Sequence, residues 1–177
     1  MNYSIAELED QIVVTLQGNN DLSGVTVRTH AGEINAQAFD FMNKQMLEGF
    51  VSLLPFVYIQ YAGRASSDPT EDYSQWTHTI RFRVYIGAKS LRERKEAQRN
   101  AYDMLSAVYD SLHGKFPKAS AQSLAPEVNQ LDGTTITTAN FNALSPLYET
   151  AGESERLIVN IPSIVVYYTD YSIRLLT

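Results

Sequence analysis

A strict alternation of apolar and polar side chains over residues 79–86 is the feature that most constrains the fold. The apolar residues are Ile80, Phe82, Val84 and Ile86, and the residues between them are Thr79, Arg81, Arg83 and Tyr85. Because successive side chains of a β-strand lie on opposite faces of the sheet, this pattern predicts a strand with one buried face. The other face of the strand is expected to carry two arginines.

Three further segments have apolar residues at helical spacing, which predicts amphipathic helices. These are the segment that begins at Ser4, residues 35–48 and residues 91–113. Ser4 and Glu7 have the spacing of a capping box at the start of the first helix, and Gly18 ends it. Gly49 is expected to end the second helix. The third helix is the longest, and its buried stripe is expected to contain Ala97, Ala101, Leu105, Val108 and Leu112.

Shorter apolar runs predict the remaining strands. Their ranges are 25–29, 55–61, 127–131, 134–138, 157–161 and 164–175. In the last strand, Val165, Tyr167, Tyr171, Ile173 and Leu175 share one face, opposite Asp170, Ser172 and Arg174. The order of these elements predicts an α/β (α+β) protein with a mixed, mostly antiparallel sheet and its helices on one side. A length of 177 residues suits a single domain.

Composition and motifs argue against an enzyme. The chain has no cysteine, which rules out disulfides, thiolate nucleophiles, zinc fingers and iron–sulfur clusters. Phosphate-loop, dinucleotide-binding and nucleophile-elbow motifs are absent, and His30, His78 and His113 lie far apart in the sequence. We therefore expect no catalytic residue, no cofactor and no metal ion. A small hydrolase or ligand-binding module is the alternative from another class, and it would need a pocket that gathers His78 with Asp or Ser side chains.

Charge and hydropathy limit the partners. Fourteen basic and 20 acidic residues give a net charge of −6, which argues against a protein that wraps DNA. No apolar run approaches the ~20 residues of a membrane-spanning helix, so no membrane contact is expected. The N-terminus has neither the basic nor the apolar region of a secretory signal.

A polar connection of fourteen residues, 63–76, lies between two predicted strands. Loops of this length within a domain are usually functional or disordered. Its acidic residues, Asp68, Glu71 and Asp72, lack the pattern of a calcium loop, so we interpret it as a solvated acidic loop. Trp76, the single tryptophan, stands where this loop meets the next strand. It either anchors the loop in the core or contributes to an interface.

The arginine face of strand 79–86, with Arg92 and Arg94 at the start of the next helix, is the most distinctive polar feature. A nucleic-acid patch would need a positive net charge, which this chain lacks. A protein interface is favoured by the abundance of Arg and Tyr. The third reading is a solvated face on which Arg81 and Arg83 pair with nearby acids.

Several segments, in order, resemble a family of small proteins from Mu-like contractile-tailed phages and prophages. They are IAELEDQI at 5–12, LPFVYIQYAG at 54–63, FRVYIGAKSLR at 82–92, AYDML at 101–105 and VYYTDY at 166–171. The family is associated with tail termination or head–tail joining. The resemblance implies a sheet flanked by helices, as in tail terminators, and a ring, commonly of six subunits, that caps the tail tube. The chain departs from the family at about residues 115–162, which are longer and richer in predicted strands, so we expect a strand-rich insertion there within a single domain of residues 1–177.

The resemblance implies a structural virion protein that is assembled in the host cytoplasm and located at the tail or neck. Its partners would be further copies of itself, tail tube and sheath proteins, and neck or connector proteins, while DNA passes through the channel without specific binding. The candidate interface residues are Arg64, Asp68, Glu71, Asp72, Trp76, Arg81, Arg83, Arg92 and Arg94. The alternative within the same class is another head–tail connector or a tail-completion protein that is monomeric until it docks.

Overall fold

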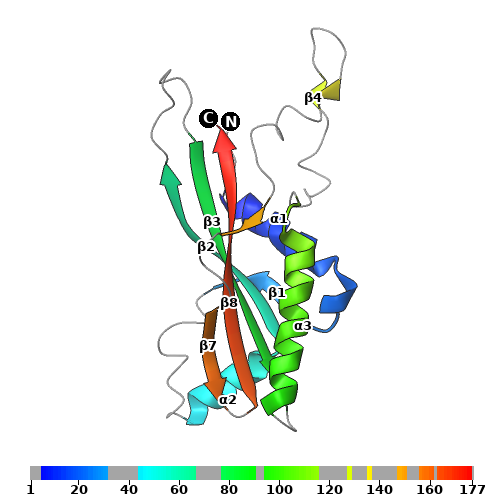
Figure 1. The fold of residues 1–177 in the computed structure, drawn as a ribbon, viewed down its shortest axis with the longest axis vertical. Helices are drawn as coiled ribbons and strands as arrows, with labels where there is room; N and C mark the ends of the chain where they lie inside the picture. Colours follow the sequence, from blue (N-terminus) through cyan, green and yellow to red (C-terminus); the bar gives the residue numbers. More distant parts are fainter. Residues whose placement is uncertain are drawn as a thin grey trace.

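The computed structural model of the chain is built around one long-stranded mixed sheet (Figure 1). It describes residues 5–31, 44–66, 77–90, 94–115, 127–128, 135–136, 147–150, 156–161 and 163–176. The helices are α1 (Ile5–Gln17), the short 3₁₀ helix η1 (Asn20–Leu22), α2 (Lys44–Leu53) and α3 (Arg94–Leu112). The strands are β1 (Thr26–Thr29), β2 (Phe56–Ser66), β3 (Thr77–Lys89), β4 (Glu127–Val128), β5 (Thr135–Ile136), β6 (Tyr148–Glu149), β7 (Arg156–Ile161) and β8 (Ile164–Leu176).

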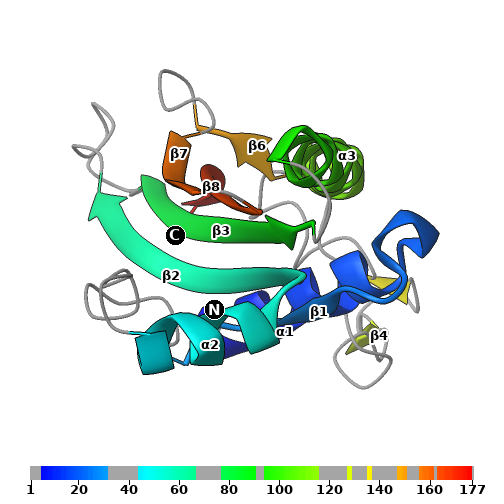
Figure 2. The same cartoon turned by 90° about the horizontal axis from the view of Figure 1, so that it is seen from below.

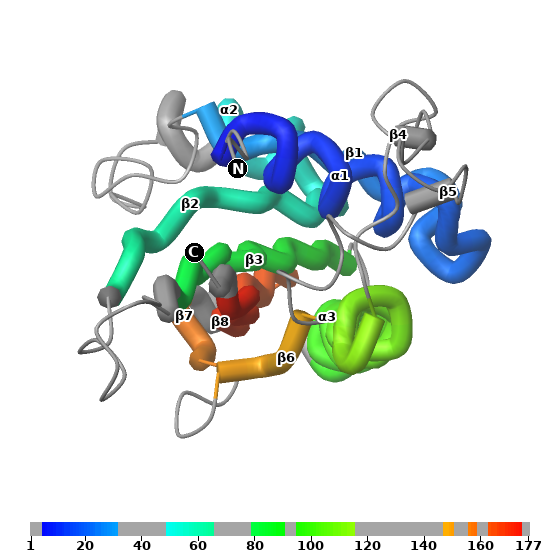
Figure 3. The backbone as a smooth tube through the Cα atoms, turned by 90° about the horizontal axis from the view of Figure 1, so that it is seen from above, coloured from blue at the N-terminus to red at the C-terminus, as the bar shows by residue number. Residues whose placement is uncertain are grey.

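The sheet runs in the order β1-β2-β3-β8, and β6 and β7 both pair with the outer edge of β8 (Figure 3). β1 and β2 are parallel, whereas the pairs β2–β3, β3–β8, β6–β8 and β7–β8 are antiparallel. β4 and β5 form a separate antiparallel pair. The predicted mixed α+β fold with a mostly antiparallel sheet is therefore confirmed.

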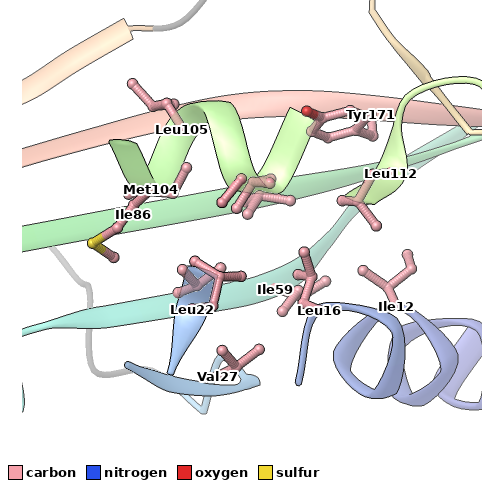
Figure 4. Packing of buried hydrophobic residues seen from close by; sticks show 14 of the residues in the cluster. Ile12, Leu16, Leu22, Val27, Ile59, Ile86, Met104, Leu105, Leu112 and Tyr171 are labelled. Atoms are coloured by element: carbon pink, nitrogen blue, oxygen red, sulfur yellow. The ribbon is translucent and has the colours of Figure 1, made fainter. Parts of the chain in front are cut away.

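One face of the sheet is covered by α1 and α3, as the apolar alternation predicts (Figure 4). Ile12 and Leu16 of α1 lie over the same sheet face as Leu105 and Leu112 of α3. The sheet contributes the alternating residues Val57, Ile59, Ile80, Phe82, Val84, Ile86, Val165, Tyr167, Tyr171 and Ile173, all buried. Each fully buried apolar side chain of this size contributes about 1.5–3 kcal/mol by leaving water, so this layer is the main source of stability.

The opposite face is also partly covered, which corrects the expectation that all helices lie on one side. Phe50 of α2 and the adjoining Leu54 pack on the strand residues of the second face. These strand residues are Phe56, Tyr58, Ile164 and Val166. In Figure 2, α2 lies across β2 on the side away from α3. β2 and β8 therefore have apolar residues on both faces near this end of the sheet, where α2 covers them.

Gly49 does not end the second helix, contrary to the sequence prediction. α2 continues through Gly49 to Leu53, just before Pro55. Residues 35–43 of the predicted helix lie outside the described part of the chain. A glycine within a helix costs about 1 kcal/mol relative to alanine. Burial of Phe50, the next residue, is worth more than this cost, so packing keeps the helix continuous through Gly49.

Strands β2 and β3 are longer than predicted. Residues 63–66 belong to β2 rather than to the loop, because the strand continues through a bulge between Tyr61 and Gly63. Gly63 has a φ of +119°, which other residues rarely adopt. β3 runs past Gly87 to Lys89. A Cβ atom at Gly87 would lie 2.5 Å from the ring of Phe56, its partner on β2, so glycine leaves the space that this ring occupies.

The strands extend beyond the helices at the end of the sheet where β2 ends and β3 begins (Figure 1). β3 and β8 have 13 residues each, and α3 has 19. A strand of this length spans about 44 Å, whereas α3 spans about 28 Å. The strand ends at Ser66, Thr77 and Leu176 therefore project past the helical layer. None of the described helices is both long and apolar enough to cross a membrane.

Candidate protein-interface site

Arg83 forms a two-point ion pair with Asp170 on the second face of the sheet. The two residues lie opposite each other on β3 and β8. Arg83 Nε donates to Asp170 Oδ1 at 2.7 Å, and Nη2 donates to Oδ2 at 2.8 Å. Asp170 is fully buried, whereas the Arg83 side chain is 30% exposed. The hydrogen bonds to Asp170 raise the pKa of the Arg83 guanidinium, so this side chain keeps its positive charge at all ordinary pH values.

Aromatic rings surround this ion pair. The Arg83 guanidinium carbon lies 4.2 Å from the centre of the Tyr168 ring, and the Tyr85 ring lies 6.1 Å from that of Tyr168. Tyr85 Oη donates to Gln60 Oε1 at 3.0 Å. A guanidinium that binds a carboxylate in its plane can also stack on a ring, so the pair and the ring fix the Arg83 side chain together.

The two predicted arginines of β3 therefore have different roles. Arg83 forms an ion pair with a buried acid. This agrees with the interpretation in which the arginines of β3 pair with nearby acids, and not with a role for Arg83 in an interface. Arg81 is half-buried and lies nearer the projecting end of the sheet, opposite Ser172 and Gly63. The sequence pattern correctly predicted that Asp170 lies on the face of β8 opposite the buried residues Val165, Tyr167, Tyr171 and Ile173. Its complete burial was not predicted, because an acid in an alternating strand is ordinarily solvated.

Arg64 and Arg81 line a hollow of about 220 Å³ at the bulge of β2. The remaining lining residues are Ala62, Gly63, Ala65 and Thr79. The bulge and its small residues create the space. The register pairs Arg81 with Gly63 and Arg64 with Ile80, so the two arginine side chains leave the strands on opposite faces of the sheet. A guanidinium beside such a hollow can bind a carboxylate through two hydrogen bonds.

The other predicted interface residues are not brought to this hollow. Arg94 begins α3, which follows the Lys89 end of β3, whereas Arg81 lies near the Thr77 end. Arg94 and Arg81 therefore stand at opposite ends of β3, and a shared interface role for them stays a prediction. Asp68, Glu71, Asp72, Trp76 and Arg92 lie outside the described part of the chain.

An exposed aromatic surface on the outside of α3 was missed by the sequence reasoning. Tyr102, Tyr109 and Tyr148 are 46%, 41% and 46% exposed. The Tyr109 ring stacks on His113 at 4.4 Å between ring centres, and His113 contacts Tyr148 edge-on at 5.5 Å. The repeat of Tyr-Asp at 102–103 and 109–110 was the available signal, because residues seven apart share a helix face.

The Glu9 carboxylate connects α1 to the bulge. Glu9 Oε1 accepts a hydrogen bond from the Tyr61 backbone N–H at 2.6 Å. Burial raises the pKa of Glu9 and the neighbouring Asp10 raises it further, while the Tyr61 hydrogen bond lowers it; the net pKa shift is upward. Glu9 therefore holds α1 to β2 beside the bulge. The partial loss of water around its carboxylate costs free energy when the group is charged.

The described residues bring together groups suited to recognition. They contain no cluster of three or more metal-binding side chains. Guanidinium, carboxylate and tyrosine groups on exposed surfaces bind other proteins through ion pairs and ring contacts. No family model matches this sequence, and no curated protein matches it.

Proposed function

We propose that this chain is a structural protein of a contractile-tailed phage that acts as a tail terminator. It forms a ring at the head-proximal end of the tail tube, stops the addition of tube subunits and provides the surface for head–tail joining. The ordered segments that resemble the Mu-like phage family support this proposal. The mixed, mostly antiparallel sheet with helices on both faces agrees with what that resemblance implies.

The observation that carries the proposal is the exposure of interface-type side chains in two separate places. Three tyrosines lie exposed on the outside of α3 and on β6. Arg64 and Arg81 line a hollow at the projecting strand ends. Tyrosine and arginine are enriched at protein interfaces and at their most important contacts. Closed rings require two different surfaces on each subunit, and this chain offers two.

The ring would act by shape. One of its faces matches the last layer of the tube, so that a further tube subunit finds no complementary surface. The other face meets the neck. The net charge of −6 suits a channel that DNA passes without adhering, because like charges keep phosphates away from the wall.

Deletion of the gene from the phage that encodes this chain tests the proposal. Tail tubes of irregular or excessive length, unjoined to heads, are the expected result in electron micrographs. Expression of the wild-type chain from a plasmid should restore a uniform length and joined particles. Tails of normal length in the deletion strain would contradict the role in termination.

A further inference from the structure

The strands of the main sheet carry a charge opposite to that of the whole chain. Strands β1, β2, β3, β7 and β8 contain one acid, Asp170, whereas the whole chain has 20 acidic residues and a net charge of −6. The lysines and arginines of the same strands are Arg28, Arg64, Arg81, Arg83, Lys89, Arg156 and Arg174. Charge is therefore segregated in this molecule, and the sheet is its basic part.

Most of these basic residues lie on the second face of the sheet, the one that α2 partly covers. By register and alternation, this face carries Arg28 on β1, Arg81, Arg83 and Lys89 on β3, Arg174 on β8 and Arg156 on β7. Three of the six stabilise the fold. Arg83 binds Asp170, and the Arg28 guanidinium lies 5.0 Å from the centre of the Tyr58 ring. Lys89 Nζ donates to a carbonyl oxygen of α2 at 3.1 Å.

The other three, Arg81, Arg156 and Arg174, are placed to bind a partner. Arg156 and Arg174 are exposed, and Arg81 is half-buried. Arg81 and Arg174 also interact within their own chain. A guanidinium has five N–H donors, so such an interaction leaves donors for a second partner. We call these three residues the basic face.

The spacing of the basic face matches an extended chain. Arg81 and Arg174 are diagonal neighbours, because Arg81 pairs with Ser172. Such neighbours are about 7–8 Å apart, and alternate side chains of an extended chain are about 6.5–7 Å apart. Arg156 pairs with Tyr168, six residues before Arg174 on β8, which is about 20 Å along the strand. An extended segment of about seven residues therefore reaches all three arginines.

The rings of the second face favour a protein partner over a nucleic acid. The Arg83 guanidinium covers the Tyr168 ring at 4.2 Å, and the Tyr85 ring lies 6.1 Å from that ring and 5.5 Å from the ring of His30. Single-stranded nucleic acids bind by stacking bases on open ring faces, and rings that contact one another offer less of this surface. The net charge of −6 also repels a long polyanion.

We infer that the basic face binds an acidic, extended segment of another protein. The chain itself shows the chemistry, since Arg83 holds the Asp170 carboxylate through hydrogen bonds of 2.7 and 2.8 Å. Carboxylates of the partner form the same charge-assisted bonds with Arg81, Arg156 and Arg174. The inference goes beyond the terminator role and does not depend on it, because it names the chemistry of a partner and not the place of the chain in a particle.

Binding of a fluorescent oligoglutamate peptide to the full-length chain tests the inference. The basic-face variant carries Arg81→Gln, Arg156→Gln and Arg174→Gln, which remove the charges and keep long polar side chains. Fluorescence anisotropy at low salt, where screening is weakest, measures the affinity. The peptide should bind the basic-face variant about tenfold more weakly than the wild type, because three exposed ion pairs are lost.

A matched control separates the basic face from net charge. It carries Lys95→Gln, Arg99→Gln and Lys115→Gln, all at exposed residues of α3 or just after it, and it has the same net charge as the basic-face variant. Its affinity for the peptide should equal that of the wild type. The single changes Arg156→Gln and Arg174→Gln should each weaken binding about two- to threefold. They keep the test decisive if the triple variant fails to fold, which circular dichroism detects.

The outcomes decide between the partners. Weaker peptide binding by the basic-face variant, with an unchanged control, supports the inference. Equal weakening in both variants overturns it, because net charge alone then attracts the peptide, and so does a wild-type chain that does not bind the peptide. An oligothymidylate of the same charge is the third probe. If it binds the wild type more tightly than the peptide and loses affinity in the basic-face variant, the face belongs to a nucleic acid and the inference is wrong.

Discussion

Arg83 and Asp170 lie opposite each other on neighbouring strands and are joined by two hydrogen bonds of 2.7 and 2.8 Å. The carboxylate is fully buried, and the guanidinium is 30% exposed. The pair therefore fixes β3 against β8 in the middle of the sheet. It also explains why one arginine of the alternating strand is structural, while its neighbour Arg81 remains a candidate for recognition.

Loss of Arg83 should destabilise the fold more than loss of its partner. Arg83→Met leaves the Asp170 carboxylate buried without a cation, which is expected to cost about 3 kcal/mol. Asp170→Asn leaves Arg83 partly exposed to water, so the expected cost is roughly half as large. Urea unfolding of the two variants measures the difference. If both variants lose the same free energy of unfolding, and less than about 1 kcal/mol, the pair contributes no more than a surface ion pair.

Glu9 should make stability depend on pH. Its pKa is raised above the ordinary value of 4.5, chiefly by burial, so the folded state holds the proton more tightly than the unfolded state. The stability that this group contributes is complete below pH 4.5 and is lost as the pH rises through the raised pKa. Glu9→Gln keeps an acceptor for the Tyr61 N–H but does not ionise.

The measurement is the urea midpoint of wild type and Glu9→Gln at pH 4 and at pH 7. The variant is expected to gain stability relative to wild type between the two values. A relative loss at pH 7 would contradict this prediction, because it would mean that the hydrogen bond from Tyr61 to the charged carboxylate outweighs the burial of Glu9.

Two glycines should respond in opposite directions to alanine. Gly87→Ala places a methyl group 2.5 Å from the Phe56 ring, and such overpacking is expected to cost about 1–3 kcal/mol. Gly49→Ala is the matched control, because Gly49 lies exposed within α2 with no atom near the added methyl group. It should stabilise the protein by up to about 1 kcal/mol. Thermal unfolding distinguishes the two, and a stabilised Gly87→Ala variant would refute the packing described for β3.

Local patterns predicted most elements but not their ends. The alternation from Ile80 to Ile86 identified β3, and helical spacing identified α1 and α3. The ends of β2, β3 and α2 depend on packing between segments that are distant in the sequence. Gly87 reads as a strand end, yet it is required inside the strand by the ring of Phe56. A single sequence does not show which distant residues meet.

The candidate site was predicted only in part, for a similar reason. Alternation placed Arg81 and Arg83 on one face correctly. It did not show that Asp170 would be buried beside one of them and not the other, since this depends on the register of β3 against β8. Tyr102 and Tyr109 have a visible seven-residue spacing, but their exposure is evident only once the buried side of α3 is known. The family resemblance and its ring remain predictions.

The central claim is that this chain ends tail-tube growth by binding the tube as a ring. The most direct test adds the purified chain to polymerising tail tube subunits and measures tube lengths by electron microscopy. The account predicts a ring on one end of each tube and a mean length that falls as the concentration of the chain rises. The account would be contradicted if tubes kept elongating without rings when the concentration of the chain equals or exceeds that of tube ends.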